Sequence, residues 1–172
     1  MATEFEHRTN DKLALAKIHL DEFTNRKERS SGDQFERGHQ ESFLFHLVGA
    51  RDSFLQEIND TCGLGLPLER VEMRSVREGL AKRGLASNAF DRIDSLEKDG
   101  KSWLFQILDL RNHCSHRLHI SRQFHRGGAR NGQIFLVLPR TGVLIEKDVH
   151  EFFQECLEEM ERLIAELRPT LP

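Results

Sequence analysis

The segment RNHCSH, residues 111–116, places an arginine, an asparagine, two histidines and a cysteine at the end of a run that otherwise reads as a buried helix. Histidine has an unperturbed pKa of about 6.5, so it takes up and releases protons near neutral pH. An arginine fork is always charged and matches the geometry of a phosphate group. These residue types suit chemistry at a phosphate, and the question is which elements position them.

The preceding run SWLFQILDL, residues 102–110, predicts a helix that Ser102 caps and that is buried along one side. At about 100° per residue, its apolar stripe continues onto Arg111 and Cys114, so Arg111 points inward or into an interface. A charge in such a place is costly unless it is paired or lines a site that binds an anion. The position therefore allows two interpretations: a structural ion pair with an acid on a neighbouring helix, or an anion site.

The rest of the chain predicts a bundle of about five to six helices. Start signals precede each of them, with capping boxes at Asp33/Glu36 and Asp148/Glu151. The run GQIFLVLPRTGVLIEK, about residues 132–146, predicts a β-hairpin before the last helix. We expect an all-α fold in one domain, residues 1–172, with helices at about 10–29 (capped by Asn10), 33–59, 67–83 (opened by Pro67), 87–97 (capped by Ser87), 102–118 and 148–168.

Composition indicates a soluble globular protein of 172 residues, with 38% hydrophobic and 31% charged residues. No apolar run approaches the length that a membrane span needs. The first residues are polar and lack a signal-peptide pattern, so we expect a cytoplasmic protein. Cys62, Cys114 and Cys156 are an odd number without a C-x-x-C pair, which indicates neither a disulfide framework nor a cysteine zinc site.

Charge is segregated along the chain, although the net charge of −3 argues against a generic nucleic-acid binder. Residues 110–145 contain no Asp or Glu, whereas residues 146–167 contain eight. A local cationic segment on an acidic body is what an anion-binding face needs, because phosphate affinity depends on the local field. The other interpretation is a solvated loop. The cationic side chains of the segment are Arg111, Arg117, Arg122, Arg126, Arg130 and Arg140, with His113, His116, His119 and His125.

Arg111 and His116, with the polar Asn112 directly after the arginine, resemble the R-x4-6-H motif of HEPN domains. The similarity extends in architecture over about residues 34–168, although the hairpin is not part of that family's helical core. Members of the family are bundles of about five helices and commonly dimers. Many are metal-independent ribonucleases or toxins that are paired with antitoxins. The resemblance implies a HEPN-like domain, RNA as substrate, no cofactor and no metal.

The resemblance also assigns roles to the motif. His116 would serve as general acid or base in cleavage of RNA by its own 2′-hydroxyl. Arg111 would hold the phosphate, and Asn112 would orient either one. Five residues on an unbroken helix lie about 140° apart, so Arg111 and His116 do not share a face. Either the helix loosens near Ser115, or two motifs meet across a twofold interface, which is what the family resemblance implies.

The loop SRQFHRGGARNG, residues 121–132, follows the motif and joins arginines to glycines. We expect this loop to be mobile and to touch the nucleic-acid backbone, with Phe124 stacking on a base. The predicted substrate-binding residues are therefore Arg117, Arg122, Arg126 and Arg130.

Several alternatives remain open at this point. His113, Cys114, His116 and His119 are a weak candidate set of metal ligands. Cys114 is a candidate nucleophile, or a small buried thiol. His39 and His46 lie seven residues apart on the central helix and could reach the cleft of the motif. Three functions remain open. The first is an endoribonuclease that could act as a toxin or defence effector. The second is a catalytically silent module that binds RNA, a nucleotide or a protein partner, and the third is a helical dimer in which Arg111 is ion-paired.

Overall fold

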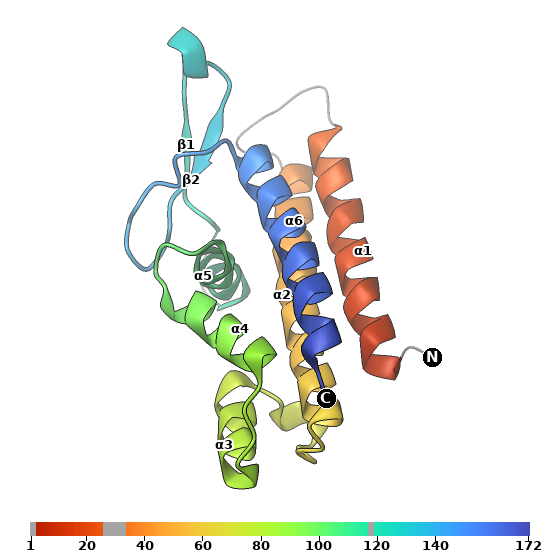
Figure 1. Ribbon diagram of the computed structural model, residues 1–172. Coiled ribbons are helices and arrows are strands. Elements are labelled where there is room, and N and C mark those ends of the chain that lie inside the picture. Colours follow the sequence, from red (N-terminus) through yellow and green to blue (C-terminus); the bar gives the residue numbers. More distant parts are fainter. Residues whose placement is uncertain (1–2, 26–33, 117–118) are drawn as a thin grey trace.

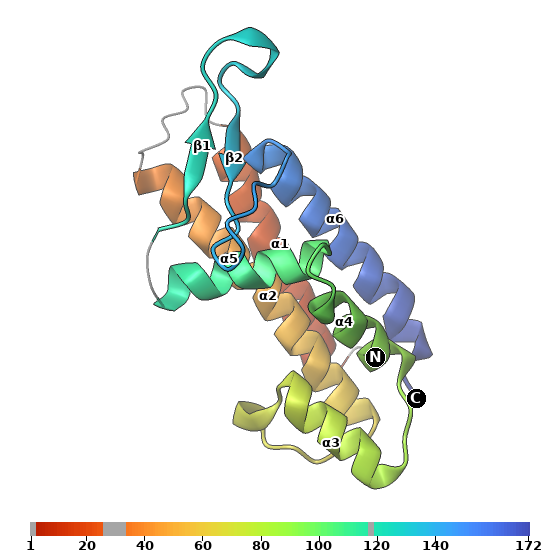
Figure 2. The same cartoon turned by 90° about the vertical axis from the view of Figure 1, so that its left-hand side faces the viewer.

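The computed structural model describes residues 3–25, 34–116 and 119–172, and these form an all-α bundle with a small β-hairpin before the last helix, as predicted. The long helices α1, α2 and α6 run side by side, and α5 lies across α2 (Figures 1 and 2). None of the described helices is long and apolar enough to cross a membrane. The elements are α1 (Glu4–Thr24), α2 (Gln34–Thr61), η1 (Leu68–Arg70), α3 (Met73–Arg83), α4 (Asn88–Lys98), α5 (Trp103–His116), β1 (Arg122–Phe124), η2 (Gly128–Arg130), β2 (Ile134–Leu136), α6 (Val149–Leu167) and η3 (Arg168–Thr170).

The first helix begins earlier than predicted. Thr3, and not Asn10, caps α1: the Thr3 hydroxyl accepts from the Glu6 backbone N–H at 3.2 Å, and the Glu6 carboxylate accepts from the Thr3 N–H at 3.0 Å. This capping box satisfies two backbone donors that a helix beginning at Asn10 would leave to water. The predicted end of this helix at Arg29 and the predicted cap at Asp33 lie outside the described residues.

Three of the other predicted caps are confirmed. Ser87 accepts from Phe90 N–H at 3.3 Å, Ser102 accepts from Phe105 N–H at 3.0 Å, and Asp148 accepts from His150 N–H at 3.1 Å. The third predicted helix is shorter than expected, because the residues after Pro67 form the 3₁₀ turn η1 and α3 begins only at Met73.

The hairpin begins earlier in the chain than residue 132, the predicted start. Strand β2 is the first of the two predicted runs, but its antiparallel partner is β1, with Gln123 opposite Phe135. The second predicted run does pair with the first, through the bridge Val137–Leu144 and backbone hydrogen bonds from Ile145 N–H to Leu136 O at 2.9 Å and from Leu138 N–H to Val143 O at 2.8 Å, but it forms no strand of its own. The hairpin projects from the end of the bundle opposite α3 (Figure 2).

The core positions α5. Leu104, Ile107 and Leu110 are completely buried on the apolar face of this helix. Helix α2 lies at the centre, where Phe43 stacks on Phe153 of α6. Burial of a leucine or isoleucine side chain contributes about 1.5–3 kcal/mol, so the stripe holds α5 in a single rotation about its axis. Residue 111 then continues the buried face toward α2.

Candidate functional site

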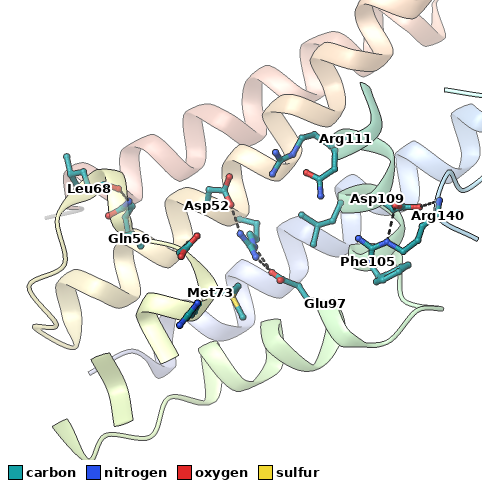
Figure 3. Close-up of a pocket in the computed structure, with 15 residues that line it drawn as sticks. Asp52, Gln56, Leu68, Met73, Glu97, Phe105, Asp109, Arg111 and Arg140 are labelled. Carbon is teal, nitrogen blue, oxygen red and sulfur yellow. Dashed lines mark hydrogen bonds and ion pairs between the residues drawn. The ribbon is translucent and has the colours of Figure 1, made fainter. Parts of the chain in front are cut away.

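Arg111 lies where three clefts meet beside α5. The wide cleft, about 740 Å³, lies between α2, α3, α4 and α5, and Asn112 also lines it. The α1 cleft, about 690 Å³, lies between α1, α2 and α5. The histidine cleft, about 370 Å³, is lined from α2 by Gly38, Glu41, Ser42, Phe45 and His46 and from α5 by Arg111, Cys114 and Ser115. Arg111 extends from α5 toward α2 (Figure 3).

Arg111 is half-buried, yet it has no acidic partner among the residues that the structure describes. Its Nε is buried and makes no hydrogen bond within this part of the chain. Three other arginines of low exposure bond carboxylates: Arg51 bonds Glu97 and Asp52, Arg122 bonds Glu36, and Arg168 bonds Glu57. A buried donor without a partner costs about 1–3 kcal/mol, and more when it is charged. The surroundings of Arg111 therefore fit an anion-binding role better than a structural ion pair.

The acids that line the wide cleft are largely engaged by other arginines. Asp52 and Glu97 bond Arg51, and Asp109 accepts from the Arg140 backbone N–H at 3.0 Å (Figure 3). The Arg140 guanidinium lies over the ring of Phe105, 5.3 Å from its centroid. These contacts hold the negative charges of the cleft in place and leave Arg111 as a cation without a partner among the described residues that line it.

The motif stays helical to its last residue. Helix α5 runs without a break through Ser115 to His116, so the helix does not loosen near Ser115. On one chain, positions 111 and 116 therefore lie about 140° apart around the helix axis. The side chain of His116 and the whole of Arg117, another predicted site residue, lie outside the described residues.

The arginines of the basic loop after the motif lie in different environments. Arg122 does not project from the surface: its side chain is 8% exposed and bonds Gln40 and Glu36, which ties β1 to α2. Burial lowers the pKa of this guanidinium. Arg126 and Arg130 are exposed on the hairpin, and Arg126 lies 5.9 Å from the centroid of the Phe124 ring. Two of the four predicted substrate-binding arginines are thus available to a ligand, and Arg122 has a structural role instead.

The structure bears on two further alternatives, Cys114 as a nucleophile and a metal site. The Cys114 thiol donates to Leu110 O at 3.1 Å, and burial raises its pKa to about 12. It is therefore a protonated, packed thiol and not a nucleophile near neutral pH. In the described part of the chain, no group of three or more His, Cys, Asp or Glu residues could hold a metal ion. The candidate set with His113 and His119 also includes His116, whose side chain lies outside the described residues.

Of the two histidines on α2, His46 lines a cleft together with Arg111 and His39 does not. His39 Nδ1 lies 3.2 Å from His19 Nδ1, whereas His46 stacks on His19 with ring centroids 5.4 Å apart. The pKa of His46 lies below its ordinary value, first because the ring is buried and then because Lys12 and His19 repel a positive charge. Lys12 and His19, which sequence reasoning missed, are seven residues apart on α1, a spacing that places them on one face.

Residues 1–171 match the family described as "Family of unknown function (DUF6586)". No curated protein and no solved structure matches the chain.

Proposed function

Because the chain belongs to the DUF6586 family, whose function is unknown, we propose a function from the site itself: a metal-independent endoribonuclease of HEPN type that cleaves single-stranded or looped RNA. The observation that carries the proposal is the half-buried guanidinium of Arg111, which has no partner among the described residues and opens onto three clefts. A phosphate oxygen supplies the partner that such a donor lacks.

The proposed reaction uses the nucleophile of the RNA. The 2′-hydroxyl attacks the adjacent phosphorus, the bond to the 5′-oxygen breaks, and a 2′,3′-cyclic phosphate forms. Arg111 stabilises the charge that develops on the phosphoryl oxygens, and His116 transfers a proton. Asn112, exposed beside Arg111 in the wide cleft, orients the substrate or the arginine by hydrogen bonding. The direct test is RNA cleavage by purified protein in EDTA.

We further propose that the active form is a homodimer, in which Arg111 of one subunit acts with His116 of the partner subunit. The unbroken helix α5 supports this arrangement, because positions 111 and 116 do not share a helix face within one chain. Phe45 supports it as well: the side chain is 58% exposed and lines two of the three clefts beside Arg111. An exposed aromatic residue at the rim of a polar site is typical of a protein interface.

Partners and location follow from the proposed activity. We propose that the protein acts on cellular RNA in the cytoplasm, and that an antitoxin in the same cell neutralises it if it serves as a toxin. The second candidate function is a silent RNA-binding module. The exposed Arg126 and Arg130 favour it, because phosphate binding by the hairpin needs no proton transfer. Binding without cleavage by the wild-type protein would select this second function.

The hairpin contribution to RNA binding is testable by salt dependence. Replacing Arg126 and Arg130 together by alanine is expected to reduce the slope of log affinity against log salt by about 1.4, since each contact to a single strand contributes about 0.7. The measurement is fluorescence anisotropy with labelled single-stranded RNA at several salt concentrations. Arg92→Ala/Arg162→Ala removes the same charge from exposed positions on α4 and α6 and should leave the slope unchanged. Equal slopes for the two double variants would mean that the hairpin is not a binding surface.

A further inference from the structure

The histidine cleft brings a second proton carrier to Arg111. His46 comes from α2 and Arg111 from α5, and both line this cleft of about 370 Å³ together with Ser42 and Ser115. His46 lies 65 residues before Arg111 in the sequence, so only the crossing of the two helices brings them to one site. Cleavage of RNA by its 2′-hydroxyl requires one group that takes a proton and one that gives a proton, and the motif contains a single residue proposed to move protons, His116.

His46 is not held by the contacts that hold the neighbouring histidines. His19 and His39 approach each other through their Nδ1 atoms at 3.2 Å. The Nδ1 of His46 is buried and has no hydrogen-bond partner in the described part of the chain. A buried polar atom without a partner is uncommon and calls for an explanation, which a ligand in the cleft provides.

The charges around His46 favour its neutral form. Lys12 and His19 face it from α1, Arg111 lines the same cleft from α5, and Glu41 is the acid that lines this cleft from α2. Burial, Lys12 and His19 lower the pKa of His46, in that order. An imidazole whose pKa is lowered is unprotonated at neutral pH and is therefore able to accept a proton.

We propose that His46 is the general base of the cleavage reaction, with His116 as the general acid. This inference rests on the proposed ribonuclease function. A ring nitrogen of His46 takes the proton of the 2′-hydroxyl as the 2′-oxygen bonds to phosphorus. The bond between phosphorus and the 5′-oxygen breaks, and the leaving oxygen receives its proton from His116. His46 then releases its proton to water and His116 takes one up from water, so that both residues return to their starting states and the step consumes no other reactant.

The test is the pH dependence of kcat/KM for a single-stranded RNA in EDTA. The wild type should give a bell-shaped profile whose acid limb reports protonation of His46 and lies below pH ~6.5. His46→Gln should lower kcat/KM by about 10²- to 10⁴-fold and lose that acid limb. Imidazole added to His46→Ala should restore part of the rate, which a merely structural role for the ring would not allow. His39→Gln, on the same helix but outside the cleft, should keep the wild-type profile.

The outcomes separate this inference from the proposed function. Cleavage by His46→Gln with an unchanged acid limb overturns the role of His46 and leaves the ribonuclease function standing. A wild-type pH profile without an acid limb also overturns the role of His46, and this result does not depend on whether any variant folds. Lack of cleavage by the wild type overturns both. Circular dichroism and the melting temperature of each variant establish whether a lost activity is a lost fold.

Discussion

Arg111→Ala is expected to lower kcat/KM for RNA cleavage by about 10³-fold or more, while the protein remains folded. The loss follows from the role of Arg111 as the cation that stabilises the phosphoryl oxygens. The retained fold follows from its surroundings: since no described acid bonds Arg111, its removal leaves no carboxylate without a partner. We expect the free energy of unfolding to change by less than about 1 kcal/mol. Steady-state cleavage assays and denaturant titration measure the two quantities.

Arg51 provides the matched control, because it lines the same wide cleft from α2 but bonds Glu97 and Asp52. Arg51→Ala leaves two acids without their partner and should destabilise the protein by about 3 kcal/mol. If Arg111→Ala is the variant that loses stability and cleavage is retained in its folded fraction, Arg111 is a structural residue and the anion interpretation is wrong.

His116→Ala is expected to lower kcat by about 10²- to 10⁴-fold, as loss of a general acid does. Mixing this variant with Arg111→Ala should restore activity, because a mixed dimer contains one site with Arg111 from one subunit and His116 of the partner subunit. Random mixing of equal amounts makes about half of the dimers mixed, each with one intact site of two, so about a quarter of the wild-type activity should return.

The complementation assay requires dimers that exchange subunits, and light scattering should give a mass near twice that of the 20.0 kDa chain. Failure to restore activity in a mixture shown to contain mixed dimers would place Arg111 and His116 of the same chain in one site, which contradicts the composite arrangement. Arg111→Ala mixed with itself after the same treatment is the control for recovery by refolding.

The parts of the fold that depend on local sequence were predictable. Ser87, Ser102 and Asp148 each cap the helix that follows them, because a cap is decided within three or four residues. The capping box at Thr3 has the same kind of local signature, with Glu6 three residues after Thr3. Strand β1 could not be predicted, because it is short and polar and pairs only through contact with β2.

The part of the candidate site that depends on local sequence was predictable, and the part that depends on contacts between distant elements was not. Helical periodicity placed Arg111 in line with the buried stripe of α5, and its side chain is half-buried there. Arg122 has a similar sequence context but bonds Glu36, 86 residues away, and no local pattern contains that information. The contribution of His46 to the cleft likewise depends on how α2 and α5 cross, and the repulsion that lowers its pKa comes from α1.

The most direct measurement is incubation of purified wild-type protein with a defined single-stranded RNA in excess EDTA, followed by analysis of the product ends. We predict cleavage that persists in EDTA, is lost in Arg111→Ala, and yields 5′-hydroxyl and 2′,3′-cyclic phosphate ends, because the nucleophile belongs to the RNA. RNA that stays intact while it binds the protein, or products that end in a 5′-phosphate, would contradict the proposed ribonuclease function.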